Sequence, residues 1–88
     1  MTQFKKDDTG KTDMSYIIDF APEFEAICKA LEYGGNKYGR YNWKNGTPER
    51  YVAAAIRHLM SIGESDTGDH LAQAAANIIL IMGLLRGK

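Results

Sequence analysis

Residues 69–85 read D-H-L-A-Q-A-A-A-N-I-I-L-I-M-G-L-L, and this stretch decides the fold. If this stretch is a helix, apolar side chains cover almost every side of it. His70, Gln73 and Asn77 form a narrow polar seam along the remaining side. At about 100° per residue these three side chains, with Asp66 one turn earlier, lie within roughly 60° of one another. A helix that is apolar nearly all round is buried on more than one face, so the stretch predicts a central helix in a helical assembly.

The polar seam has two possible explanations. An imidazole and two amides inside an apolar helix must find partners, or each costs about 1–3 kcal/mol. The seam is therefore either a buried hydrogen-bond network that fixes the packing or one wall of a ligand or metal site. The neighbouring motifs favour the second explanation.

Composition predicts a single small globular domain over residues 1–88. The chain is 44% hydrophobic and 25% charged, and its formal net charge is zero. A neutral chain has no long-range attraction for nucleic acid or an anionic membrane, so we expect neither as a partner. The apolar stretch is too short and too interrupted by amides to span a bilayer. Because it is apolar on two sides, we expect a homo-oligomer.

We expect a cytoplasmic protein, the host cytoplasm if a phage encodes it. The N-terminal residues are polar and charged and do not resemble a secretory signal. Cys28 is the single cysteine and falls at an expected core position, which is typical of a reducing compartment.

The remaining helices have clear boundary signals. The first should begin at Pro22, bury Phe24, Ile27, Cys28 and Leu31, and end at Gly39. The second should have Thr47 as its N-cap, Pro48 in its first turn, and Gly63 as its end. Its apolar stripe would be Val52, Ala55, Ile56 and Leu59. Since no stretch alternates long enough to predict a strand, we expect an all-α domain of three helices, or four with a short extra one, after an arm over residues 1–15.

The connector over residues 36–46, N-K-Y-G-R-Y-N-W-K-N-G, contains three aromatic and three cationic residues. Lysine and arginine hold phosphates, and aromatic rings offer a flat surface to a base. The alternative is that Tyr38 and Trp43 simply anchor the connector to the core.

An acidic loop, residues 64–69, precedes the last helix and contains Glu64, Asp66 and Asp69 beside His70. Acidic residues at a helix N-terminus are favourable for the helix dipole alone, so a solvated capping cluster is one explanation. The other is a site for Mg²⁺ or Mn²⁺, which prefer carboxylate oxygens. Zinc is not expected, because only two histidines and one cysteine are present.

Several motifs together resemble one family. They are K-D-D-T-G-K at residues 6–11, Y-G-G-N-K-Y-G at 33–39 followed by N-W at 42–43, R-H-L at 57–59, and G-E at 63–64 with Asp66, H-L-A at 70–72 and Asn77. The chain resembles the small dATP/dGTP diphosphohydrolase proteins of phage genomes, which are relatives of the MazG-like all-α nucleoside triphosphate pyrophosphohydrolases.

This resemblance implies an α-helical oligomer that binds a purine deoxynucleoside triphosphate and, with Mg²⁺ or Mn²⁺, releases pyrophosphate. Carried over by position, Glu64, Asp66 and His70 would be catalytic, and the same three with Glu32 would hold the metal. The nucleotide-binding residues would be Lys11, Lys37, Tyr38, Asn42, Trp43, Arg57 and Asn77.

The chain also departs from the wider superfamily, which pairs an E-x-x-E motif with an acidic E-x-x-D. Here Glu25 and Glu32 lie seven residues apart, Ala26 stands where relatives often have Glu, and Gln73 replaces a frequent second histidine. Two alternatives therefore stay open. One is a non-catalytic protein that sequesters a nucleotide or cyclic nucleotide signal. The other is a plain helical interaction module, which leaves the connector and the polar seam unexplained.

Overall fold

The computed structural model describes residues 3–63 and 67–87, and over these residues the chain is helical with no strand. This result confirms the all-α prediction. The elements are α1 (Tyr16–Asp19), α2 (Ala21–Tyr38), a 3₁₀ helix η1 (Asn42–Asn45), α3 (Pro48–Met60) and α4 (Thr67–Arg86).

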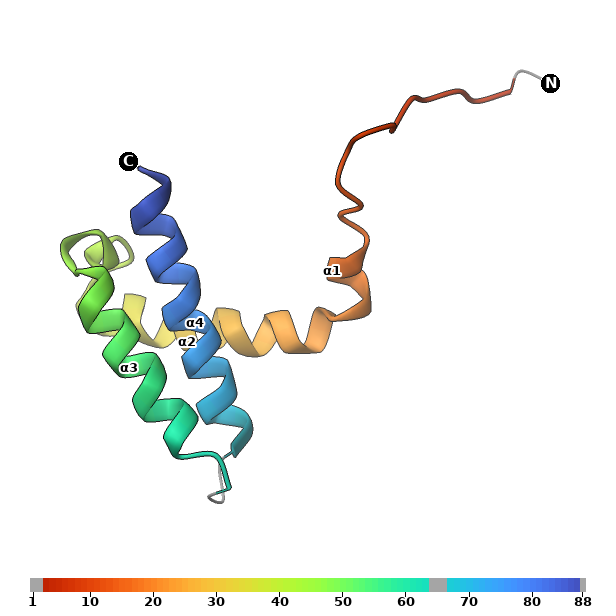
Figure 1. Cartoon of the computed structure of the whole chain (residues 1–88). Helices are drawn as coiled ribbons and strands as arrows, with labels where there is room; N and C mark the ends of the chain where they lie inside the picture. The colour runs from red at the N-terminus through yellow and green to blue at the C-terminus, as the bar shows by residue number, and fades with distance from the viewer. Residues whose placement is uncertain (1–2, 64–66, 88) are drawn as a thin grey trace.

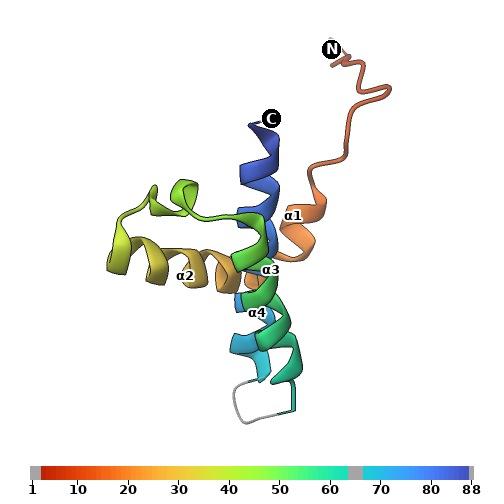
Figure 2. The same cartoon turned by 60° about the vertical axis from the view of Figure 1, so that its left-hand side comes forward.

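Helices α3 and α4 lie side by side, and α2 crosses them (Figures 1 and 2). The contacts of α4 with both α2 and α3 place it at the centre of the domain, as its apolar sequence predicts. Residues 3–13 form no helix and extend away from this group of helices (Figure 1). The short helix α1 packs mainly against α2.

Local sequence explains where the helices begin and end. Gly39 has φ +98° and its N–H donates to the carbonyl of Gly35 at 2.8 Å, which ends α2 with a backbone conformation that suits glycine. The Thr47 hydroxyl accepts a hydrogen bond from the N–H of Arg50 at 3.3 Å, as expected of an N-cap. The expected boundaries at Gly39 and Thr47 are confirmed.

Three elements differ from the expected pattern. Helix α3 ends at Met60, three residues before the expected end at Gly63. Residues 42–45 of the connector form the 3₁₀ helix η1 and not an irregular loop. Helix α4 begins at Thr67, inside the loop that we expected to continue to Asp69. The acidic first turn of α4 therefore includes Asp69, which complements the positive end of the helix dipole.

The core of the single chain is small. Among the residues whose burial is described, only Ala55, Ala74 and Ala76 are buried. Cys28, expected in the core, is exposed, and Phe24 is 39% exposed. The expected stripe of α3 is exposed in the same way at Val52, Ile56 and Leu59. Small alanines allow α3 and α4 to approach closely, but larger apolar side chains stay on the outside of the chain.

No helix in the described part of the chain is both long and apolar enough to span a membrane.

Candidate functional site

An open hollow of about 550 Å³ lies where α2 crosses the first turns of α4. Its volume falls within the range of about 300–1,000 Å³ that is typical of ligand sites. The residues that line it are Pro22, Glu25, Ala26, Lys29, Ala30 and Tyr33 of α2, His58 of α3, and Asp69, His70, Ala72 and Gln73 of α4.

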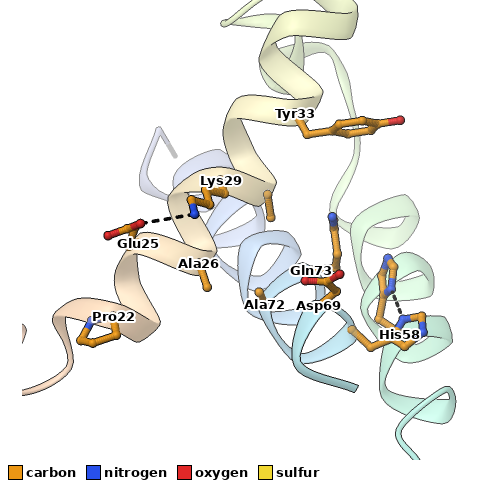
Figure 3. A pocket seen from close by; sticks show the side chains of 11 residues that line it. Pro22, Glu25, Ala26, Lys29, Tyr33, His58, Asp69, Ala72 and Gln73 are labelled. Carbon is orange, nitrogen blue, oxygen red and sulfur yellow. Dashed lines mark hydrogen bonds and ion pairs between the residues drawn. The ribbon is translucent and has the colours of Figure 1, made fainter. Parts of the chain in front are cut away.

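Helical periodicity explains why these residues share one wall. Glu25, Lys29 and Tyr33 recur at every fourth position of α2, and such residues lie on the same face of a helix. Ala26 and Ala30 lie between them, and their small side chains leave the space open. Figure 3 shows Tyr33 and Lys29 on one side of the hollow and Gln73, Asp69 and His58 on the other.

A pair of histidines joins α3 to α4 at the edge of the hollow. The Nδ1 atoms of His58 and His70 lie 3.0 Å apart, and the ring centroids lie 5.3 Å apart with an interplanar angle of 42°. Both side chains are half-buried. A hydrogen bond at this separation requires that one Nδ1 carries a proton and that the other does not.

Glu25 and Lys29 form an ion pair on the α2 side of the hollow. The Lys29 Nζ lies 3.3 Å from Glu25 Oε1, and the side chains are 73% and 70% exposed. An exposed pair of this kind contributes at most about 1 kcal/mol, so a ligand can separate it at little cost. The Glu25 carboxylate points toward Lys29 and away from His58 (Figure 3). Glu32, the other first-helix carboxylate and a predicted metal ligand, does not line the hollow.

The predicted metal ligands Glu64 and Asp66 lie outside the described residues. Within residues 3–63 and 67–87, no three His, Cys, Asp or Glu side chains are grouped closely enough to hold a metal ion. The described donors alone therefore do not form a Mg²⁺ site. His70, the third predicted ligand, directs its Nδ1 at another imidazole and not at a carboxylate.

The polar seam of α4 contains one hydrogen bond within the helix and two residues at the hollow. Asn77 donates from Nδ2 to the carbonyl oxygen of Gln73 at 2.8 Å, one turn earlier in the same helix. Asn77 thus has a partner within α4, although it was expected to bind nucleotide. At the other end of the seam, His70 and Gln73 line the hollow.

The connector lies at the opposite end of α4. A Cβ atom added to Gly83 would lie 3.0 Å from the ring carbons Cη2 and Cζ3 of Trp43, so the indole lies directly against the helix backbone. The Tyr51 hydroxyl also donates to the Trp43 carbonyl at 2.8 Å. For Trp43, these contacts support the explanation that it anchors the connector. A shallower hollow of about 310 Å³ forms there, lined by Trp43, Lys44, Gly83, Leu84, Arg86 and Gly87.

Other cations of the connector lie over aromatic rings. The Lys37 Nζ lies 5.2 Å from the centroid of the Tyr38 ring, and the Lys44 Nζ lies 5.1 Å from that of Tyr41. Hydrogen bonding to Tyr38 raises the pKa of Lys37, so this ammonium stays charged at neutral pH. Lys37, Tyr38 and Tyr41 are exposed.

The predicted nucleotide-binding residues do not converge within one chain. At about 1.5 Å per residue, His70 and Gly83 lie about 20 Å apart along the axis of α4. Lys11 is in the extended arm, and Arg57 is exposed on α3. None of the predicted set lines the larger hollow: Lys11, Lys37, Tyr38, Asn42, Trp43, Arg57 and Asn77.

Sequence reasoning missed Lys29 and Tyr33 as residues of the hollow. The signal available was the spacing of Glu25, Lys29 and Tyr33 on one face of α2, with small alanines between them. His58 was noted as part of R-H-L but was given no role in the site. Its pairing with His70 depends on how α3 and α4 are placed side by side, which the spacing of a single helix does not determine.

Comparisons with known proteins agree with the motifs. The family described as "dATP/dGTP diphosphohydrolase, N-terminal" matches residues 1–88. The protein named dATP/dGTP diphosphohydrolase in Salmonella phage PMBT28 is 36% identical over 90 residues, an alignment that covers 94% of this chain. The same alignment covers only 30% of the phage protein, so the chain spans less than a third of that relative. No solved structure matches the chain.

Proposed function

Because the chain belongs to the dATP/dGTP diphosphohydrolase N-terminal family, we propose that it binds a purine deoxynucleoside triphosphate and, with Mg²⁺, hydrolyses it to monophosphate and pyrophosphate. The activity in the printed name is that of a relative more than three times as long, so the reaction is proposed for this chain. The observation that carries the proposal is the larger hollow, where a cation and an aromatic ring face a histidine pair.

The walls of the hollow suit the parts of a nucleotide. Lys29 offers an ammonium group to phosphate oxygens once it separates from Glu25. Tyr33, which is 65% exposed, offers an aromatic face on which a base can stack. Gln73, on the opposite wall, offers an amide that both donates and accepts hydrogen bonds.

The histidine pair supplies a place to hold a proton. One proton between the Nδ1 atoms of His58 and His70 keeps the two imidazoles in fixed orientations. In the proposed reaction, His58 would donate its Nδ1 proton to His70 and accept a proton from the attacking water at its own Nε2, because the Nε2 of His70 is buried. Lys29 would offset negative charge that develops on the phosphate oxygens.

Mg²⁺ is part of the proposal, although the described donors alone do not form its site. Glu64 and Asp66 would have to supply the carboxylates, with His70 and a carboxylate of α2 beside them. When bound, Mg²⁺ neutralises phosphate charge and activates water.

We also propose that the chain works as a homo-oligomer. Its accessible surface is 7443 Å², whereas a compact monomer of 9.8 kDa exposes about 5,200 Å². The excess of roughly 2,200 Å² is larger than the about 800 Å² that each partner buries in a standard interface, although the extended arm contributes part of it. The residues available for burial include Val52, Ile56, Leu59, Leu71, Ile78, Ile79 and Met82.

An oligomer would also bear on the nucleotide-binding prediction. Because about 20 Å separates the two ends of α4 in one chain, residues of the connector would reach a nucleotide in the larger hollow from a second copy. Tyr38, Asn42 and Trp43 therefore stay proposed as contacts to nucleotide across an interface. Lys37, whose Nζ lies 6.0 Å from the centroid of the Tyr33 ring, would contact the nucleotide from the same chain.

The alternative function is nucleotide sequestration without turnover. It is favoured by one observation: the Glu25 carboxylate at the hollow is turned toward Lys29 and away from His58. A protein with this arrangement would bind a nucleotide through Lys29 and Tyr33 and release it unchanged.

The experiment that separates these functions uses the purified full chain with dATP or dGTP, with MgCl₂ or with EDTA. Formation of the monophosphate and pyrophosphate in the MgCl₂ samples alone supports the proposal. Tight binding with the triphosphate recovered intact supports sequestration. If the protein neither binds nor hydrolyses either nucleotide, both functions are wrong.

A further inference from the structure

The connector carries a surface that the proposed hydrolysis uses only in part. Between Tyr33 and Pro48 the sequence contains three cationic residues and no acidic one, although the whole chain has zero net charge. We call these cations and the rings beside them the basic aromatic strip, which comprises Lys37, Tyr38, Arg40, Tyr41, Trp43 and Lys44. Arg40, Tyr41 and Lys44 have no part in the proposed hydrolysis.

Each cation in the second half of the strip lies close to an aromatic ring. The Lys44 Nζ lies 5.1 Å from the centroid of the Tyr41 ring and 5.8 Å from that of Trp43. The Arg40 Cζ lies 5.9 Å from the Tyr41 centroid, so this one ring has two cations near it. Such pairs place a positive charge beside a flat aromatic face. These are the groups that bind the phosphate and the base of one nucleotide in a strand.

The fold holds the strip in place and leaves it open to solvent. A Cβ atom added to Gly35 would lie 3.5 Å from the Cα of Arg40, so the connector turns back against the last turns of α2. Trp43 is half-buried and packs against Gly83, whereas the ring of Tyr41 is 64% exposed. A ligand therefore meets rings that are already positioned, and less ordering opposes its binding.

The shallower hollow continues the strip toward the end of α4. Trp43 and Lys44 line it, and Arg86 of α4 adds a further cationic side chain beside them. A free nucleotide carries phosphate on one side of its base, whereas a nucleotide within a strand has a phosphate on each side. Cations that alternate with rings along a surface therefore match a strand better than a single nucleotide.

The residue types favour a nucleic acid over a protein as the partner. Protein interfaces are enriched in tyrosine, tryptophan and arginine but depleted in lysine, and two of the three cations of the strip are lysines. In a duplex the bases stack on one another and are hidden from protein rings. A single strand offers unstacked bases, so it is the form that exposed tyrosines bind.

We propose that the basic aromatic strip binds single-stranded nucleic acid without a sequence requirement. Lys37, Arg40 and Lys44 contact backbone phosphates, and Tyr38 and Tyr41 stack on bases. The zero net charge of the chain removes long-range attraction, but charges at about 0.15 M salt act over only about 8 Å, where the strip alone is felt. This inference does not depend on the proposed hydrolysis.

The affinity test uses the full chain, EDTA and a fluorescein-labelled oligothymidylate of about 12 nucleotides, a length within the known site sizes of single-strand binding proteins. Fluorescence anisotropy compares the unchanged chain with Tyr41→Ala and Tyr16→Ala, a matched control because the two rings are 64% and 63% exposed. We expect Tyr41→Ala to lose about tenfold in affinity, since one base loses its stacking partner, and the control to lose none. Equal affinities of the two variants would overturn the proposal.

The salt dependence of binding is a second measurement that leaves the aromatic rings unchanged. Lys44→Gln should reduce the slope of log affinity against log salt concentration by about 0.7, the value for one phosphate contact with a single strand. Lys5→Gln removes the same charge from the extended arm and should not change the slope. Equal changes in both lysine variants would mean that the chain attracts the strand through diffuse charge, and the proposal would be wrong.

Three competitors identify what the strip recognises. They are a duplex of the same length, poly-L-glutamate, and free thymidine monophosphate at the same nucleotide concentration. We expect only the unlabelled single strand to displace the probe. Displacement by the duplex or by poly-L-glutamate would indicate recognition of charge alone, and displacement by the monophosphate would indicate a site for one nucleotide; each result contradicts the proposal. Because the probe contains no purine and Mg²⁺ is absent, a negative result leaves the proposed hydrolysis intact.

Discussion

The indole ring of Trp43 lies against the backbone of Gly83, so close that a methyl group at Gly83 would approach its ring carbons to 3.0 Å. This contact fixes the connector over the C-terminal half of α4. It also gives the glycine of an otherwise apolar helix a specific role, since a larger residue would move the ring.

The Gly83→Ala variant tests that contact, with Gly34→Ala in α2 as the matched control. A Cβ atom at Gly34 meets nothing within 4 Å, so alanine there should stabilise the helix by about 0.5–1 kcal/mol. At Gly83 the same gain is opposed by displacement of the indole. We expect no gain in the free energy of unfolding and a red shift of fluorescence, which reports on Trp43 as the single tryptophan. An unshifted spectrum with equal stabilisation of both variants would refute the contact.

Thr47→Ala should destabilise the protein by about 1 kcal/mol, because the N–H of Arg50 loses the side-chain oxygen that accepts its hydrogen bond. Urea denaturation followed by circular dichroism measures this loss. Thr9→Ala in the extended arm is the control and should change the free energy of unfolding by less than about 0.5 kcal/mol. Equal effects of the two substitutions would show that Thr47 is not a cap.

The raised pKa of Tyr51 predicts that the protein loses stability in alkaline solution. Burial raises the pKa of the Tyr51 hydroxyl above its usual value of about 10, against a smaller opposing effect of Arg50. Because the folded-state pKa is the higher one, the stabilisation is complete below about pH 10 and is lost as the pH rises through the folded-state pKa. Ionisation also removes the proton that Tyr51 donates to the Trp43 carbonyl.

The measurement is thermal unfolding of Tyr51→Phe and the unchanged chain between pH 8 and pH 11. The stability difference between them should shrink at the alkaline end of this range. Tyr41→Phe, at an exposed position, is the control and should follow the unchanged chain. A difference that stays constant with pH would mean that Tyr51 does not titrate as proposed.

Tyr33→Ala should weaken binding of dATP or dGTP about tenfold, because stacking of a base on an aromatic side chain contributes about 1–3 kcal/mol. Tyr16→Ala is the matched control, since Tyr16 is 63% exposed in α1, compared with 65% for Tyr33, and lies outside the hollow. Fluorescence or calorimetric titration with EDTA present measures binding without turnover. Equal affinities of the two variants would remove Tyr33 from the site.

The helices could be predicted because their signals are local. Gly39, Thr47 and Pro48 act within a few residues of their own positions, and the structure places helix ends beside all three. The central position of α4 followed from its lack of a polar face. By contrast, Trp43 in the 3₁₀ helix at 42–45 packs against Gly83, which lies far away in the sequence, and no local signal indicates that contact.

The hollow could be predicted only in part. His70 and Gln73 were recognised as polar residues in an apolar helix, which is a local signal. Lys29 and Tyr33 of α2 lie beside them because of the angle at which α2 crosses α4. The spacing of residues in the sequence does not determine that angle. The prediction that Cys28 is buried was wrong for the single chain, for a related reason. An apolar periodicity shows that a face will be covered, but it does not show whether the cover comes from the same chain.

The most direct test of the central claim is a nuclear magnetic resonance titration of the full chain with a non-hydrolysable dATP analogue. If the larger hollow is the nucleotide site, the strongest shift changes fall on Lys29, Tyr33, His58, His70 and Gln73. Changes confined to the connector, residues 36–46, with none at the histidine pair, would contradict the account.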